Sequence, residues 1–162
     1  MKKLFKVSSE FYIAIVVCML VLSSCSYEPK PFDYGKDVCE HCKMTIIDPK
    51  WGAQIITNTG KIYRFDVIEC LILYKNKNQN QEFNSKIKSI WTINYLKPGT
   101  FIKAEDAFFI KSPDFNSPMG LNAVTIKNEE DAKKIKLTHN PEILKWEDLQ
   151  RLVKEEFSVT NQ

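Results

Sequence analysis

The chain has 162 residues, 44% of them hydrophobic, and its 23 basic and 20 acidic side chains give a net charge of +3. That length can bury one compact core or two small packed ones, and the near balance of charge excludes a large surface for nucleic acid or another polyanion. Residues 74–88 hold four lysines, but Phe83 is the only aromatic residue between them. A site for nucleic acid would need more aromatic side chains for base stacking, so we expect a solvated loop there and no nucleic-acid partner.

The N-terminal 24 residues have the features of a targeting segment. Three lysines within the first six residues precede an apolar run from Phe11 to Leu22. Its 12 residues are too few for a membrane span of about 20 and fit the core of a signal peptide, roughly 7 to 15 residues. The run ends in "LSSC", which resembles the bacterial lipobox, a motif whose cysteine is lipidated and becomes the new N-terminus. We therefore expect residues 1–24 to be a lipoprotein signal peptide, the alternative being an ordinary secretory signal.

Cys25 would then anchor the protein to a membrane through lipid, on the extracytoplasmic, periplasmic side, and Ser26 slightly favours the outer membrane. Residues 25–37, "CSYEPKPFDYGKD", contain two prolines and few apolar side chains. This composition favours a lipidated tether that would place Cys39 on the order of 40 to 50 Å from the anchor. Such a tether would let the globular part meet a partner away from the membrane.

Three thiols remain once Cys18 leaves with the signal and Cys25 carries lipid. They are Cys39, Cys42 and Cys70. An odd number of thiols in an oxidising compartment argues against a disulfide scaffold and for at least one cysteine with another task.

Residues 38–100 are expected to form a first unit of two strands, a helix and a third strand. The first two strands are joined by the turn "NTG", as in a hairpin. Residues 66–74 have helical spacing with Asp66 as a plausible N-cap, and Cys70 falls on the apolar face, where a free cysteine usually belongs to the core. The expected strands are 52–57, 61–65 and 89–96.

Residues 101–162 repeat the same order of elements and end in an amphipathic helix. Asn128 is expected to cap the first helix of this second unit. The fold class is therefore α+β, with two small ββαβ units in tandem plus a C-terminal helix. The expected elements are strands at 106–111, 121–126 and 141–146 and helices at 128–135 and 147–157.

The pair Cys39 and Cys42 places two sulfurs on one turn, which suits a disulfide, a redox couple or a metal. Haem attachment fails because Lys43 stands where a histidine is required. A redox couple normally opens a helix, whereas "MTIID" favours extended structure. Zinc would need four ligands, and the two histidines are His41, between the cysteines, and the distant His139.

Met44 shifts the balance toward a softer metal. In an extended segment residues two apart point the same way, so Cys42 and Met44 would face one side. Two thiolates, from Cys39 and Cys42, and one thioether form the soft, low-coordinate site that Cu(I) favours. We therefore interpret the motif as a Cu(I) carrier site rather than a catalytic centre.

The chain resembles the NosL family of membrane-anchored copper lipoproteins, in which a lipobox cysteine and a short tether precede Cys-x2-Cys-x-Met. The segments "RFDVIECLILY", "AEDAFFI" followed by "SPMG", and "IKNEEDAKKI" resemble the rest of that pattern in order. One departure is Lys43, where the family often has glycine.

The resemblance implies a fold similar to organomercurial lyase, with Met119 of "SPMG" as a further Cu(I) ligand candidate. It also implies a copper donor for assembly of the copper centres of nitrous oxide reductase, through a dedicated membrane transporter complex. The alternatives are an extracytoplasmic thiol-disulfide oxidoreductase or a zinc-binding lipoprotein. A lyase acting on organometals would need an acid beside the thiols, and Asp66 near Cys70 is the one suggestive pairing, which an N-cap explains better.

Overall fold

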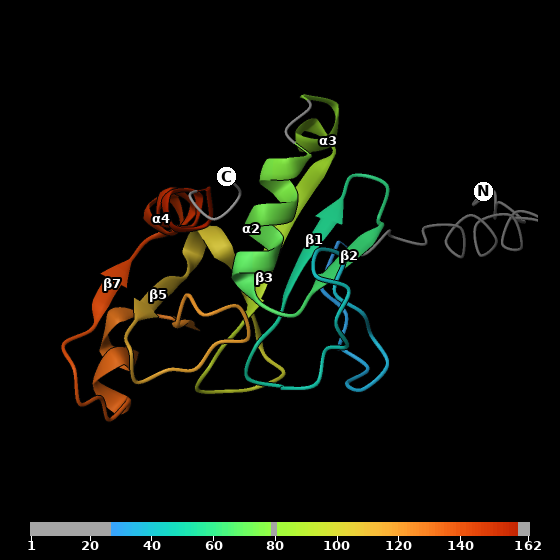
Figure 1. The fold of residues 1–162 in the computed structure, drawn as a ribbon. Helices are drawn as coiled ribbons and strands as arrows, with labels where there is room; N and C mark the ends of the chain where they lie inside the picture. The colour runs from blue at the N-terminus through green and yellow to red at the C-terminus, as the bar shows by residue number, and fades with distance from the viewer. Residues whose placement is uncertain (1–26, 79–80, 159–162) are drawn as a thin grey trace, which may run out of the picture.

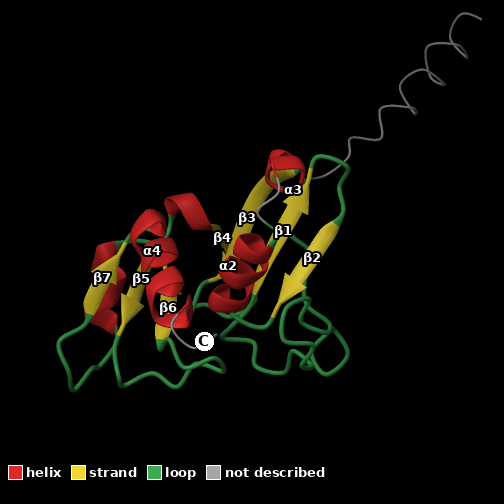
Figure 2. Ribbon diagram, turned by 45° about the horizontal axis from the view of Figure 1, so that its top comes forward, coloured by secondary structure: helices red, strands yellow, loops and turns green. Residues whose placement is uncertain are grey.

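The computed structural model describes residues 27–78 and 81–158. The expected signal peptide and the expected lipidation at Cys25 lie outside these residues. Two antiparallel sheets lie side by side, one with the strand order β2-β1-β3-β4 and one with the order β6-β5-β7 (Figures 1 and 2). The two small sheets and the C-terminal helix confirm the expected α+β class.

The expected hairpin opens the first sheet. Strand β1 (Ala53–Thr57) pairs with β2 (Ile62–Phe65), and Gly60, with φ of 80°, lies in the turn where a left-handed residue is required. All five residues of β1 are buried, because this strand lies between β2 and β3. The strand therefore forms the centre of the first unit.

Helix α2 (Ile68–Lys77) begins two residues later than expected. Its N-cap is Val67, whose side chain makes no capping hydrogen bond, so the prediction that Asp66 caps this helix is wrong. The predicted solvated loop is also wrong in part, because α3 (Gln81–Ser85) lies within it. Phe83 packs edge-on against Tyr63 and Tyr74, each at 5.7 Å between ring centroids, and this aromatic cluster orders the segment.

Two further strands complete the first sheet. Strand β3 (Ile87–Ile93) pairs with β1, and β4 (Phe101–Lys103) pairs with β3. Strand β4 has only three residues, and no pattern in the sequence predicted it. Its pairing extends the first sheet past residue 100, where we expected the first unit to end.

Residues 27–37, which belong to the segment expected as a tether at 25–37, pack on the first unit. Phe32 is buried and stacks on Phe101, with ring centroids 5.9 Å apart. The backbone N–H of Lys30 donates to Gln54 Oε1 at 3.1 Å, and Gln54 Nε2 donates to the Lys30 carbonyl at 2.6 Å. One aromatic anchor and a paired hydrogen bond to a buried glutamine outweigh the polar composition of the segment.

The second unit departs further from the expected pattern. Its helix at 128–135 is a 3-10 segment, η2 (Glu129–Lys134), although Asn128 caps it as expected by accepting from the Asp131 N–H. The closing helix is confirmed as α4 (Trp146–Ser158). The remaining elements are η1 (Ala104–Asp106), β5 (Phe108–Lys111), β6 (Ala123–Ile126) and β7 (Glu142–Leu144).

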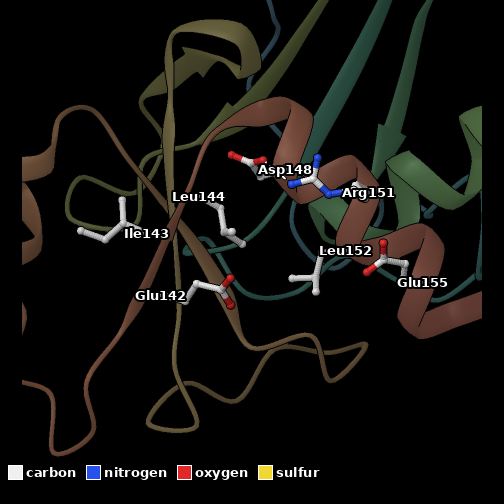
Figure 3. A pocket seen from close by; sticks show the side chains of 7 residues that line it. All are labelled: Glu142, Ile143, Leu144, Asp148, Arg151, Leu152 and Glu155. Carbon is white, nitrogen blue, oxygen red and sulfur yellow. Dashed lines mark hydrogen bonds and ion pairs between the residues drawn. The ribbon is translucent and has the colours of Figure 1, made fainter.

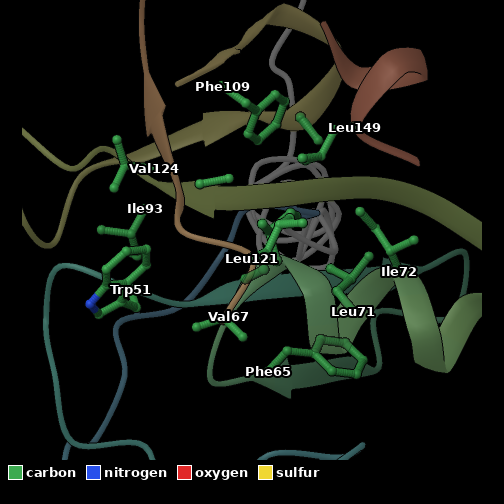
Figure 4. Packing of buried hydrophobic residues seen from close by; sticks show 14 of the residues in the cluster. Trp51, Phe65, Val67, Leu71, Ile72, Ile93, Phe109, Leu121, Val124 and Leu149 are labelled. Atoms are coloured by element: carbon green, nitrogen blue, oxygen red, sulfur yellow. The ribbon is translucent and has the colours of Figure 1, made fainter. Parts of the chain in front are cut away.

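One hydrophobic core joins the two units. Figure 4 shows Phe65 and Leu71 of the first unit in the same cluster as Phe109 and Leu149 of the second. Helix α2 also meets α4, where Lys75 Nζ donates to Gln150 Oε1 at 2.7 Å. Within the described parts of the chain, no helix combines the length and the hydrophobicity needed to cross a membrane.

Candidate metal-binding site

The Cys-x2-Cys motif lies on a tight turn. The Cys39 N–H donates to the Met44 carbonyl at 2.9 Å, and the Lys43 N–H donates to the Cys39 carbonyl at 3.0 Å. Lys43 closes the turn with φ of 63°, a left-handed conformation that favours glycine. The turn is fastened to β2 by the Glu40 N–H, which donates to the Arg64 carbonyl at 2.9 Å.

This turn overturns one step of the sequence argument. Only an isolated bridge between Val38 and Thr45 has β pairing here, so the two-residue alternation of a strand does not apply to Cys42 and Met44. The turn also differs from the helix start that a thioredoxin-like couple would use. The motif thus presents its cysteines from a loop that the neighbouring strand supports.

Helix α2 brings a third thiol to this turn. The Sγ atoms of Cys39, Cys42 and Cys70 all lie within 4.8 Å of one another. Cys39 and Cys70 are fully buried and Cys42 is half-buried, and all three are free thiols. Cys70 was expected to be a core cysteine. The helical spacing of Cys70 indicated that it is buried. The odd number of thiols was the one signal in the sequence that a cysteine has a role beyond packing or a disulfide.

The three thiols differ in their affinity for a proton. A hydrogen bond from Cys70 lowers the pKa of Cys39 to about 5, helped by the backbone N–H groups of Asp66, Cys42 and His41. The same hydrogen bond, with burial, raises the pKa of Cys70. Burial also raises the pKa of Cys42. The metal-free cluster at neutral pH therefore holds one thiolate, on Cys39, and two thiols.

Two acidic residues at the start of α2 belong to the surroundings of the cluster. Asp66 is 4% exposed, and burial, followed by the charge on Cys39, raises its pKa to about 6. Glu69 is fully buried, and burial raises its pKa to about 7. The sequence offered no sign of Glu69, because a glutamate in the first turn of a helix is most often an exposed residue.

The two methionines lie in different environments. Met44, on the turn, is 56% exposed. Met119 is half-buried, packs against the shared core and belongs to the turn that follows β5 in the second unit. The structure thus brings the three cysteines together, whereas the roles of Met44 and Met119 as ligands stay predictions.

The histidines add little to the site. His41 lies between the two motif cysteines, and burial lowers the pKa of its imidazole, so the ring is neutral at pH 7. It lines a surface hollow of about 240 Å³ beside the turn, together with Lys43 and Tyr74. His139 is exposed and its Nδ1 contacts Asp114 at 3.0 Å, in the second unit.

A second hollow lies between β7 and α4 and has a different chemistry (Figure 3). It has a volume of about 360 Å³ and is lined by the carboxylates of Glu142, Asp148 and Glu155, by the apolar side chain of Leu152 and by Arg151, whose guanidinium donates to Asp148 Oδ1 at 2.6 Å. Oxygen ligands of this kind suit hard cations, and the hollow has no sulfur ligand. The three thiols are therefore the better candidate for a soft metal.

Three sulfurs so close together, one of them already a thiolate, match the ligands of Cu(I) and can also serve zinc with a fourth ligand. Metal binding would displace the protons of Cys42 and Cys70. The geometry alone thus indicates a thiophilic metal site built from the turn and from α2.

Comparisons with known proteins identify the fold and the family. The crystal structure of the copper chaperone NosL from Shewanella denitrificans has a similar fold, with a TM-score of 0.61 and 17% identity, over 76% of this chain and 96% of that one. No curated protein matches the chain. The family model NosL, however, matches residues 33–153, most of the length. The chain therefore belongs to the NosL family.

Proposed function

We propose that the protein is a membrane-anchored, extracytoplasmic carrier of Cu(I). It would deliver copper for assembly of the copper centres of nitrous oxide reductase, through that enzyme's copper-assembly transporter complex. The observation that supports copper carriage is the cluster of Cys39, Cys42 and Cys70 within 4.8 Å. The support for the partners is membership of the NosL family, and the support for the anchor is the lipobox-like segment that ends at Cys25.

The cluster suits binding followed by release. Cys39 supplies a thiolate at neutral pH because the Cys70 thiol lowers its pKa, and Cu(I) would replace the protons that Cys42 and Cys70 still hold. Cys42 lies nearest to solvent of the three, so it is the first sulfur that an acceptor can displace. Met44, exposed two residues later, would offer a weak thioether during that ligand exchange.

A thiol-disulfide oxidoreductase is the second candidate, because Cys39 has a lowered pKa of about 5 and such enzymes use low-pKa thiols. Cys39 is fully buried, however, and a thiolate that solvent cannot reach does not attack a protein disulfide. Copper carriage fits the burial better, since a metal ion can bind from the Cys42 side.

The test of metal choice is an anaerobic Cu(I) competition titration of the fragment 26–162 against a chromogenic chelator, with zinc in parallel. This fragment contains every residue of the shared core. We expect one Cu(I) per chain and far weaker zinc binding. Cys42→Ser together with Met44→Leu should weaken Cu(I) binding, whereas His139→Ala, at an exposed site in the second unit, should leave it unchanged. An unchanged affinity for Cu(I) in the variant that carries both Cys42→Ser and Met44→Leu would contradict the proposal.

Anchor and partner need separate experiments in cells. Cys25→Ser should move the protein from the membrane fraction to the soluble fraction, and mass spectrometry of the wild-type N-terminal peptide should show a lipid. Deletion of the chain's gene should leave nitrous oxide reductase deficient in copper, with restoration by the wild type but not by the Cys42→Ser variant. A fully loaded reductase without the chain would contradict the proposed partner.

A further inference from the structure

Residues 27–37 form a strap that runs along β1. At the start of the strap, the Tyr27 hydroxyl donates at 3.2 Å to the carbonyl of Asn58, in the turn between β1 and β2. Further along, Lys30 exchanges two hydrogen bonds with Gln54 of β1. These contacts follow β1 from the turn at its end back toward its beginning, so the strap is fixed along the strand.

The other end of the strap joins the turn that carries Cys39 and Cys42, here named the thiol turn. A carboxylate oxygen of Asp37 lies 3.1 Å from Arg64 Nε of β2, in an ion pair, and the Asp37 carbonyl accepts from the Ile46 N–H at 2.9 Å. The strap therefore connects its first residue to the thiol turn as a fixed length of chain and not as a free tether.

The two ends of the strap lie at opposite ends of the first sheet. Figure 2 shows α3 and the arrowhead of β1 at one end of this sheet and the arrowhead of β2 at the other. Gln54 pairs with Arg64, near the thiol turn, and Asn58 lies four residues further along β1 at the opposite end. Four residues of an antiparallel strand span about 14 Å, which separates the start of the strap from the thiol turn.

The proposed lipid would enter the membrane at the end of the sheet that carries Asn58. Cys25 precedes Tyr27 by two residues, and two extended residues span at most about 7 Å. A bilayer that holds a lipid on Cys25 would therefore lie next to the β1–β2 turn, and the thiol turn would lie further from it.

This end of the sheet carries three exposed lysines. Lys61 precedes β2, and Lys86 and Lys88 lie at the start of β3. The Asn58 N–H donates to the Lys86 carbonyl at 2.8 Å, which holds the β1–β2 turn beside the start of β3. The three ammonium groups thus belong to one surface, here named the lysine end.

Other side chains at the lysine end suit a bilayer interface. Tyr27 is 37% exposed, and Lys88 Nζ lies 5.6 Å from the centroid of its ring. A tyrosine ring with its polar hydroxyl is typical of the boundary between headgroups and hydrocarbon. Two acids lie nearby, Glu28 on the strap and Glu82, which pairs with Lys86 at 2.6 Å. Three lysines against two acids leave the lysine end positive.

We propose that the lysine end rests on the membrane, with Lys61, Lys86 and Lys88 on anionic phospholipid headgroups, while the strap holds the thiol turn on the side away from the bilayer. This inference rests on the lipid anchor at Cys25 that is part of the proposed function. Each lysine near an anionic surface strengthens binding about fivefold, which is enough to select one orientation of a chain that lipid already holds at the surface. An acceptor of copper would then approach from the side opposite the membrane.

The test uses isoleucine methyl groups as markers of position. The lipidated chain is placed in nanodiscs of phosphatidylethanolamine and phosphatidylglycerol that contain a gadolinium chelate on some headgroups. Ile62 and Ile87 adjoin the lysines, whereas Ile47, 71% exposed, follows the thiol turn. Relaxation by gadolinium falls with the sixth power of distance, and the thiol turn lies about 14 Å further away. We therefore expect the methyls of Ile62 and Ile87 to relax about tenfold faster than that of Ile47.

A flexible insertion tests the strap without changing the folded part. About 20 glycine and serine residues inserted between Ser26 and Tyr27 have a root-mean-square length of about 25 Å, so the lipid would no longer fix which end faces the bilayer. The difference between Ile62 and Ile47 should fall severalfold. The same linker added after Gln162 is the matched control and should leave the difference unchanged.

Neutral substitutions test the headgroup contacts. The change to glutamine of all three lysines at the lysine end should reduce the difference between Ile62 and Ile47, and so should nanodiscs of phosphatidylcholine alone. The matched control changes to glutamine three exposed lysines of the second unit and should have no effect; these are Lys127, Lys133 and Lys136.

The outcomes separate this inference from the anchor. If mass spectrometry finds no lipid on Cys25, the proposed anchor and this inference are overturned together. A lipidated chain in which the Ile47 methyl relaxes as fast as that of Ile62 overturns the inference and leaves the anchor standing, and so does a difference that the linker after Ser26 does not change. A difference that persists both in the lysine variant and in phosphatidylcholine would also overturn it and leave these lysines for a protein partner.

Discussion

The two units follow a similar order of strands and helix, yet they differ in what they bury. In the first unit the first five residues of α2 are all buried, Glu69 and Cys70 among them. In the second unit the corresponding element is the short 3-10 segment η2, in which Asp131 is the buried residue. Helix α2 packs a carboxyl and a thiol into the shared core, whereas the buried carboxylate of η2 forms an ion pair with the exposed Lys134.

The buried polar groups differ accordingly. Asp66, Glu69 and Cys39 in the first unit have shifted pKa values because burial and neighbouring thiols act on them. In the second unit the buried hydroxyls of Ser117 and Thr125 are neutral and hydrogen-bonded. The first unit therefore carries the chemistry, and the second supplies packing.

The largest expected effect tests whether the second unit supports the first. Phe109 is fully buried and its ring packs 6.1 Å from that of Trp146. Phe109→Ala should lower the free energy of unfolding by about 3 to 5 kcal/mol. Since the two units share one core, tryptophan fluorescence and far-UV circular dichroism should report a single urea transition. Two separate transitions would show that the first unit folds alone.

The next effect concerns the third thiol. Cys70→Ser should weaken Cu(I) binding on the order of 100-fold, about 3 kcal/mol, because a hydroxyl is a poor ligand for this soft ion. The measurement is the same competition titration, with circular dichroism to confirm the fold. Equal affinity in the wild type and Cys70→Ser would restrict the site to the turn and remove α2 from it.

A pH titration of metal-free stability tests the buried glutamate. The folded-state pKa of Glu69 is raised to about 7, so the folded chain keeps a proton that the unfolded chain loses above about pH 4.5. This residue's contribution to stability is therefore complete below pH 4.5 and is lost as pH rises toward 7. Stability relative to Glu69→Gln should fall by about 2 kcal/mol between pH 5 and pH 7.

Comparison with Glu69→Gln is necessary because Cys39 acts in the opposite direction. Its lowered pKa means that the folded chain loses a proton which the unfolded chain keeps, so its contribution rises with pH above about 5. Subtracting the variant's curve cancels this effect. A difference between the two curves that stays constant with pH would place the carboxyl of Glu69 in contact with water.

The smallest expected effects are changes in stability at two left-handed residues, one in the turn of the Cys-x2-Cys motif and one in the turn that follows β5. Lys43 has φ of 63° and Gly120 has φ of 85°. Lys43→Gly should raise stability by about 0.5 kcal/mol, since relief of left-handed strain outweighs the greater freedom of glycine in the unfolded chain. Gly120→Ala should lower it by about 1 kcal/mol. Thermal melts of both variants measure these changes. The Lys43 ammonium also forms an exposed ion pair with Glu40 at 3.4 Å, and destabilisation by Lys43→Gly would show that this ion pair matters more than the strain.

Local pattern was sufficient for much of this protein. The hairpin of β1 and β2, the cap at Asn128, the closing helix α4 and the motif at Cys39 and Cys42 all follow from neighbours in sequence, because turn residues, caps and periodicity act over a few residues. The same short segments carried the family resemblance. The sequence by itself thus determined the class of fold and the family.

The tertiary structure decided which groups meet at the site. A helical face shows that Cys70 is buried, but the packing of α2 against the turn decides that it faces Cys39. The same packing buries Glu69 under the Met119 turn and leaves Asp66 beside a thiolate instead of at a helix cap. These contacts join residues 27 or more positions apart, as from 39 to 66, from 39 to 70 and from 69 to 117, and such distances in sequence leave no periodic signal.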